Sequence, residues 1–161
     1  SFDQRQRLVI NGVLGSPFER GAGVGTILAD VTVAPIFTYS TGHPFNLLLG
    51  FDANNDTNAN TDRPVFAGRN TGMGPDLMTL DLRIAKNFRF RNDAPYHLEG
   101  IFEAFNLFNR VNFSGVNNVV GSMPLNSYRV RGRSDAGPAD PLGFTSAFDP
   151  RQIQLGLKFR F

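Results

Sequence analysis

Residues 52–62, DANNDTNANTD, carry oxygen-bearing side chains at a spacing that could hold a metal ion. Asp or Asn stands at every second position, and the opening D-x-N-x-D matches the first three ligand positions of a calcium loop. Ca²⁺ prefers hard oxygen ligands of this kind. The candidate ligands are Asp52, Asn54, Asp56, Asn58 and Asp62.

The match to a calcium loop ends after its fifth position. A full loop has Gly at the sixth position and a bidentate Glu at the twelfth, where this chain has Thr57 and Arg63. The alternative interpretation is a turn-rich polar loop whose Asn and Asp side chains bond their own backbone. The sequence favours the polar loop and leaves Ca²⁺ open as the one candidate cofactor.

Catalytic patterns are missing from the sequence. The two histidines, His43 and His97, have no nucleophile or second ligand beside them, and no Ser-His-Asp, HExxH or GxSxG arrangement occurs. The glycine-rich residues 21–25 resemble a nucleotide-binding turn, but the alternation from Ile27 onward predicts a strand after them and no helix. We therefore expect a protein that is not an enzyme.

A cluster of charged side chains is expected on one face of two predicted strands. Glu99 and Glu103 share a face with His97, and Asp81 could lie near them. Such a cluster is the normal filling of a barrel lumen, where carboxylates pair with basic side chains. The expected partners are Arg83 and Arg89.

Composition narrows the class of protein further. The 161 residues fit one domain, with 41% hydrophobic residues, 19% charged residues and a net charge of +2. The chain has no run of five like charges that could follow a nucleic acid backbone. Arg129, Arg131 and Arg133 are interpreted as a solvated loop rather than an anion site. The chain has no cysteine, no apolar run near 18 residues and no signal peptide at Ser1. If the protein is exported, its start would lie upstream.

The C-terminal residues 151–161, RQIQLGLKFRF, alternate strictly between apolar and polar side chains. Their length suits a β-strand that crosses a membrane, which takes about 9–11 residues. A strand that ends on an exposed Phe is a hazard in a soluble sheet, whereas a lipid-facing strand uses every apolar side chain. The apolar positions are Ile153, Leu155, Leu157, Phe159 and Phe161.

Period-two patterns and turn residues predict about six antiparallel strands. Pro35 predicts a bulge or an unpaired position in the second strand, and Lys86 alone breaks the apolar face of the fourth. The predicted strands are 5–14, 26–39, 45–50, 78–90, 96–108 and 151–161.

The connections between these strands alternate long, short, long, short, long. An up-and-down outer-membrane barrel has tight turns at its periplasmic rim and long loops at the other, whereas a Greek-key sandwich gives no reason for this alternation. The sequence therefore predicts the C-terminal part of a transmembrane β-barrel in the outer membrane. Residues 51–77 and 109–150 would lie outside the cell.

Three segments resemble the closing strands of TonB-dependent outer-membrane receptors. They are most similar to the Oar-like branch, which carries a carboxypeptidase-regulatory-like N-terminal domain. The segments are DLRIAKNFRF at 81–90, EAFNLFNRVNF at 103–113 and AFDPRQIQLGLKFRF at 147–161. The turn GHPF at 42–45, DRP at 62–64 and GRN at 68–70 are similar as well, so the resemblance spans nearly the whole chain.

The resemblance implies a receptor that takes up a large or scarce ligand, with outer-membrane lipid, the barrel assembly machinery and the TonB system as partners. Such receptors have about 22 strands and an N-terminal plug. Six strands cannot close a membrane barrel. We therefore expect residues 1–161 to be the C-terminal strands of a longer receptor, reaching TonB through its N-terminal part. Apolar residues alternating up to a C-terminal Phe are similar to the signal that the assembly machinery reads.

Two alternatives remain open from the sequence. One is a soluble or secreted β-sandwich that binds Ca²⁺, and perhaps carbohydrate, through residues 52–62. The other is a small barrel assembled from several copies of the chain. The transported ligand is not predicted.

Overall fold

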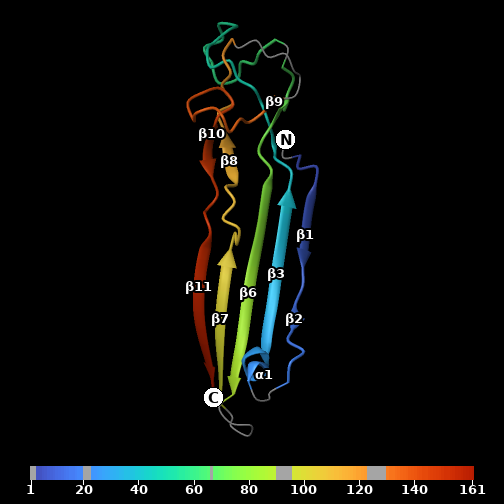
Figure 1. Cartoon of the computed structure of the whole chain (residues 1–161). Helices are drawn as coiled ribbons and strands as arrows, with labels where there is room; N and C mark the ends of the chain where they lie inside the picture. Colours follow the sequence, from blue (N-terminus) through green and yellow to red (C-terminus); the bar gives the residue numbers. More distant parts are fainter. Residues whose placement is uncertain (1–2, 20–22, 66, 90–95, 123–129) are drawn as a thin grey trace. The chain divides into compact units, whose positions relative to one another are not determined.

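The computed structural model describes residues 3–19, 23–65, 67–89, 96–122 and 130–161 (Figure 1). Eleven strands and one short helix form within them. In chain order the elements are β1 (Arg7–Asn11), β2 (Leu14–Gly15), α1 (Val24–Leu28), β3 (Val31–Ser40), β4 (Pro44–Phe45), β5 (Gly72–Met73), β6 (Leu77–Arg89), β7 (His97–Phe105), β8 (Phe113–Val116), β9 (Val130–Arg131), β10 (Phe144–Ala147) and β11 (Gln152–Arg160).

The chain folds into two compact units. The strand unit comprises Val9–Thr38, Met78–Arg110 and Pro150–Phe161. The loop unit comprises Ser1–Leu8, Tyr39–Leu77 and Val111–Asp149. No helix within the described residues is long and apolar enough to cross a membrane.

The main sheet is an up-and-down meander. Its strands lie in the order β1-β3-β6-β7-β11, with β2 also paired to β3. The arrows of β3, β6, β7 and β11 alternate in direction (Figure 1), and the registers of β6 with β7 and of β7 with β11 are antiparallel. Among the described strands the sheet is open, because β1 and β11 each lie at an edge. The fold is thus all-β with mostly antiparallel strands, as the sequence predicts.

Three long predicted strands are confirmed with small shifts of their ends. Predicted strands 78–90, 96–108 and 151–161 correspond to β6, β7 and β11. The first predicted strand, 5–14, is present as the pair β1 and β2.

A break between β1 and β2 lies opposite Pro35. Gly12 and Val13 leave the strand conformation, and the Gly12 backbone N–H donates to the Pro35 carbonyl at 3.3 Å. Proline has no backbone N–H to return to the ladder. The irregular pairing expected at Pro35 is therefore found in the neighbouring segment, while β3 itself continues through the proline.

Two predictions about the strands are wrong. Residues 26–28 belong to α1, which begins at Val24 within the glycine-rich residues, where no helix was expected, so β3 begins only at Val31. Residues 45–50 do not form a strand of the main sheet. Only Phe45 of that segment lies in a strand, as the end of β4 in a small sheet of the loop unit.

These corrections change the pattern of connections. Residues 41–76 now form one long connection between β3 and β6, and residues 106–151 form another between β7 and β11. In an antiparallel meander both connections leave from the same end of the strands. The α1 helix lies at the opposite end of the strands, near the end of β6 and the start of β7 (Figure 1).

The loop unit has its own small hydrophobic core. Leu47, Val120 and Leu142 are buried there, and Phe45, Ala67 and Val130 pack against them. The unit contains a three-stranded sheet, β4-β5-β9, and a two-stranded sheet, β10-β8. The two long connections, predicted as polar loops, therefore fold together into ordered structure.

Candidate functional site

The main sheet has one apolar face, which the register of three strands defines. Because side chains alternate along a strand, residues that pair across the sheet point to the same face. Three rows across β6, β7 and β11 are apolar: Leu82–Ala104–Ile153, Ile84–Phe102–Leu155 and Phe88–Leu98–Phe159.

This apolar face is open along β11. Leu155 is 82% exposed and Leu157 is 78% exposed, in the middle of a nine-residue strand. An exposed apolar band on strands of this length is what a lipid-facing barrel wall requires. The residues predicted as an assembly signal, Ile153, Leu155, Leu157, Phe159 and Phe161, are all exposed.

Aromatic rings gather where β11 ends. The ring of Phe159 stacks on Tyr96, with centroids 6.3 Å apart and planes 8° apart. The ring centroids of Phe161 and Phe159 lie 6.1 Å apart. Aromatic girdles of this kind mark the edges of the apolar band in membrane barrels.

The opposite face of the sheet is polar and carries ion pairs. Arg83 Nη1 lies 3.0 Å from Glu103 Oε1, and Arg160 Nη2 lies 3.8 Å from Glu99 Oε2. His97 shares this face by its register with Arg160. The expected pairing of Arg83 with a carboxylate is confirmed, whereas the side chain of Arg89 lies outside the described part of the structure.

Asp81 fastens the turn that follows β7. Its carboxylate Oδ1 accepts the backbone N–H of Asn106 at 2.9 Å. It thus ties β6 to the end of β7. That Asp81 lies near Glu99 and Glu103 stays a prediction.

Lys86 is satisfied although it interrupts the apolar face. Its ammonium donates to the carbonyls of Thr26, Ile27 and Ala29, the last at 3.0 Å. The α1 helix thus places three carbonyl oxygens around one charge. A cation among helix C-terminal carbonyls is favourable, and an unpaired charge in lipid would be costly.

The Phe-Asn-Leu-Phe-Asn run at 105–109 forms the turn by which the chain leaves β7. Asn106 and Asn109 both have φ of +51°, a left-handed conformation that asparagine tolerates better than most residues. The Asn106 side chain donates to the Arg110 carbonyl at 2.9 Å and accepts the Arg110 N–H at 3.1 Å.

Asn109 reaches the start of β11 from the same turn. Its side-chain oxygen accepts the backbone N–H of Arg151 at 3.0 Å. The backbone N–H of Leu107 donates to the Leu80 carbonyl at 2.8 Å. The run therefore fastens three neighbouring strands at the end from which the long connections leave.

The predicted calcium ligands lie in one loop and serve as backbone acceptors there. The two Asp52 oxygens accept the N–H groups of Asp56 and Thr57, at 3.2 and 2.8 Å. Asn54 Oδ1 accepts the Asp56 N–H at 3.0 Å, and Asp56 Oδ1 accepts the Asn58 N–H at 2.9 Å. These are the Asx turns of the polar-loop interpretation.

One feature of that loop agrees with a calcium loop. Thr57, at the sixth position, has φ of +72°, the left-handed conformation for which such loops use Gly. Asp62 is buried, and its Oδ2 accepts the Ala53 N–H at 2.6 Å. Within the described residues, no three His, Cys, Asp or Glu side chains gather as a metal site. Calcium binding stays a prediction.

Two arginines of the last connection are paired with carboxylates. Arg131 lies 3.9 Å from Asp76, and Arg133 lies 2.6 Å from Asp135. The side-chain hydrogen bond from Arg133 lowers the pKa of Asp135 below its ordinary value, and the same bond raises the pKa of Arg133. Arg129 lies outside the described residues. The pairing supports a solvated loop over an anion site.

An open meander with a lipid-type face, an ion-paired face and an aromatic edge defines a segment of a membrane β-barrel wall. The chain belongs to the family described as the outer membrane beta barrel domain, whose model matches residues 66–154, more than half of the chain. It is therefore an outer-membrane β-barrel chain. No curated protein and no solved structure matches it.

Proposed function

We propose that the chain forms the C-terminal barrel strands of a TonB-dependent receptor that imports a ligand too large or too scarce for porins. The observation that carries this proposal is the folded loop unit. Its core of Leu47, Val120 and Leu142 shows that connections from neighbouring strands fold into one structure. Ordered structure of this kind suits recognition of a ligand, which a passive pore does not need.

The other parts of the proposal rest on the resemblance of the closing strands to Oar-like receptors. The apolar face contacts outer-membrane lipid, and the alternating residues ending at Phe161 are read by the barrel assembly machinery. The TonB system engages an N-terminal part of the receptor. The strands and loops perform no catalysis.

The soluble β-sandwich has less support. A sandwich buries the apolar face of one sheet against a second sheet, yet Leu155 and Leu157 are exposed on the face of the main sheet. Family membership also points to the outer membrane.

Binding of TonB tests the receptor proposal. The protein, extracted from outer membranes in detergent, is passed over immobilised periplasmic domain of TonB, with a trimeric porin as control. We expect retention that excess soluble TonB domain abolishes. A barrel that assembles in the outer membrane but is not retained would contradict the receptor function and leave the family assignment intact.

A further inference from the structure

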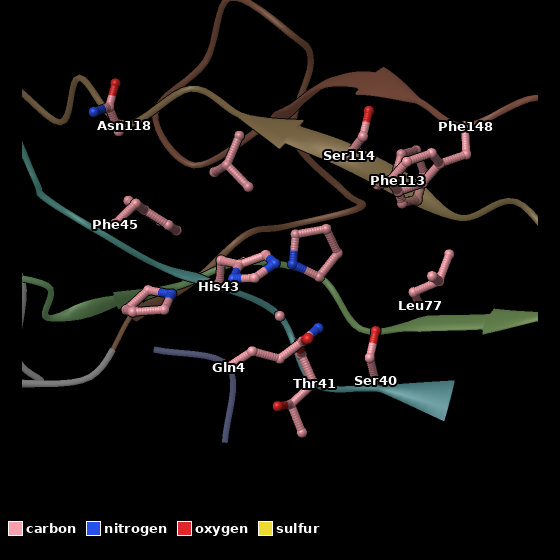
Figure 2. Close-up of a pocket in the computed structure, with 15 residues that line it drawn as sticks. Gln4, Ser40, Thr41, His43, Phe45, Leu77, Phe113, Ser114, Asn118 and Phe148 are labelled. Carbon is pink, nitrogen blue, oxygen red and sulfur yellow. The ribbon is translucent and has the colours of Figure 1, made fainter. Parts of the chain in front are cut away.

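A cavity of about 400 Å³ lies within the loop unit (Figure 2). Its wall is formed by the end of β3, by β4 and β8, and by the chain that follows β5. Binding sites for small molecules span roughly 300–1,000 Å³, so the cavity is large enough for a small ligand.

Aromatic rings supply the apolar part of the wall. Phe113 and Phe148 lie at one end of the cavity and Phe45 at the other (Figure 2). Phe148 is 55% exposed, although it lies in a compact unit. An exposed ring beside a cavity provides a flat apolar surface on which a ring-shaped ligand can stack.

Ser40 supplies a buried polar group that has no partner. The residue is 5% exposed, and its hydroxyl forms no hydrogen bond with another described residue. Among the described residues, no side-chain nitrogen or oxygen is both sealed from solvent and unpaired. The Ser40 hydroxyl is therefore accessible to solvent, and its residue lines the cavity. A hydroxyl can both donate and accept there.

Two side-chain amides add acceptors to the same wall. The Gln4 amide nitrogen donates to the Thr41 carbonyl at 3.3 Å, and the Asn118 amide nitrogen donates to the Asn46 carbonyl at 3.0 Å. Both nitrogens are thus used within the protein. The side-chain oxygens of Gln4 and Asn118 form no bond with another described residue and are left for a ligand.

Among the described residues that line the cavity, none is Asp, Glu, Lys or Arg. A charged ligand would lose water there without gaining an opposite charge, which is costly. We propose that this cavity binds one or two rings of a neutral saccharide. A sugar ring has an apolar C–H face, which suits the phenylalanines, and a rim of hydroxyls, which suits Ser40, Gln4 and Asn118.

The backbone beneath the cavity is closely packed and fixed by hydrogen bonds. A Cβ on Gly42 would lie 2.0 Å from the Gly74 carbonyl oxygen, so only glycine allows this approach. The Gly42 N–H donates to Asp76 Oδ1 at 3.0 Å, and the Gly74 N–H donates to the His43 carbonyl at 2.9 Å. A wall held in this way is preorganised, which reduces the entropy that binding would cost.

Saturation-transfer NMR on the detergent-solubilised protein tests the proposal. The probes are maltose and cellobiose at millimolar concentration, with glucuronate as a charged probe and N-acetyl-phenylalanine amide as an apolar one. The variants are Phe148→Ala, whose side chain is exposed, and Ser40→Ala, which removes one oxygen. Phe51→Ala is the matched control, because Phe51 is 46% exposed in the same unit and does not line the cavity.

We expect transfer to at least one neutral disaccharide and none to glucuronate. Phe148→Ala and Ser40→Ala should each weaken binding by about tenfold, the effect of roughly 1.4 kcal/mol, while Phe51→Ala leaves it unchanged. The proposal is overturned if neither disaccharide binds, if both cavity variants bind like the native protein, or if the phenylalanine amide gives the stronger signal. Because TonB is not involved, these outcomes are independent of the receptor test.

Discussion

Asn106 and Arg110 are joined by a reciprocal pair of hydrogen bonds, in which one side-chain amide closes the turn that leaves β7. Asn106 is 6% exposed, so water does not replace these bonds easily. Losing a buried hydrogen bond costs roughly 1–3 kcal/mol. One side chain therefore closes the turn from which Leu107 contacts Leu80 of β6 and Asn109 contacts Arg151 next to β11.

Asn106→Gly and Asn106→Ala should separate the two contributions of this residue. Glycine keeps the left-handed backbone and loses the side-chain bonds, whereas alanine loses the bonds and also strains the backbone by about 1–2 kcal/mol. We expect the free energy of unfolding to fall in the order native, Asn106→Gly, Asn106→Ala, measured by urea titration in detergent micelles. Equal stability of both variants and the native protein would show that the turn does not depend on Asn106.

The two faces of β11 predict opposite responses to added charge. Leu155→Arg places a charge on the apolar face and should destabilise the folded protein in lipid by about 2–4 kcal/mol. Gln154→Arg is the matched control, because Gln154 pairs with Glu103 on the polar face. Folding into lipid vesicles, followed by heat-dependent mobility on gels, measures the difference. Equal losses in both variants would contradict the lipid assignment.

The strands that were predicted well are those whose two faces have different surroundings. In β6, β7 and β11, rows such as Ile84–Phe102–Leu155 alternate with rows such as Arg83–Glu103–Gln154, and this alternation is visible in the sequence. The ion pair of Arg83 with Glu103 could be predicted for the same reason.

The segments that were predicted wrongly carry apolar residues that do not belong to the apolar face of the main sheet. Residues 45–50 resemble a strand, but Leu47 packs into the core of the loop unit, with Val120 and Leu142 from the second long connection. Periodicity does not reveal which residues a side chain packs against. Residues 26–28 are rich in strand-forming residues, yet they are helical where Lys86 binds their carbonyls. Tertiary contacts override local propensity there.

The corrected topology predicts which connections face the cell exterior. Val65 lies in the connection that follows β3, and Ile27 lies in α1, which precedes β3. Both side chains are exposed. The chain has no cysteine, so Val65→Cys and Ile27→Cys can each be labelled singly. We expect a membrane-impermeant maleimide to label Val65→Cys in intact cells and Ile27→Cys only after lysis. The reverse pattern would invert the barrel.

Lys86 should control the local stability of α1. In Lys86→Met, the carbonyls of Thr26, Ile27 and Ala29 lose their charged donor. A hydrogen bond to a charged group contributes roughly 1.5–3 kcal/mol to stability. We expect faster amide exchange at Ala29, whose N–H donates to the Gly25 carbonyl at 2.9 Å. Lys158→Met, on the opposite face, is the control. Unchanged exchange at Ala29 would mean that α1 is stable without Lys86.

Calcium binding by residues 52–62 has a direct calorimetric test. Asp52 and Asp56 place carboxylate oxygens in one short loop, and Thr57 directly after Asp56 has the left-handed conformation of the sharp turn in a calcium loop. The twelfth position lacks the bidentate Glu, so we expect weak binding, with a Kd of about 10⁻⁴–10⁻³ M as in extracellular modules. Ca²⁺ titrated into the native protein should give a saturable heat.

The double variant Asp52→Ala/Asp56→Ala should abolish that heat. Asp135→Ala is its control, because it removes a carboxylate of the loop unit that pairs with Arg133 outside the loop. If Ca²⁺ gives no heat with the native protein, the Asp and Asn oxygens serve only the loop's own backbone. Their hydrogen bonds to the N–H groups of Asp56, Thr57 and Asn58 are then sufficient reason for the alternating sequence.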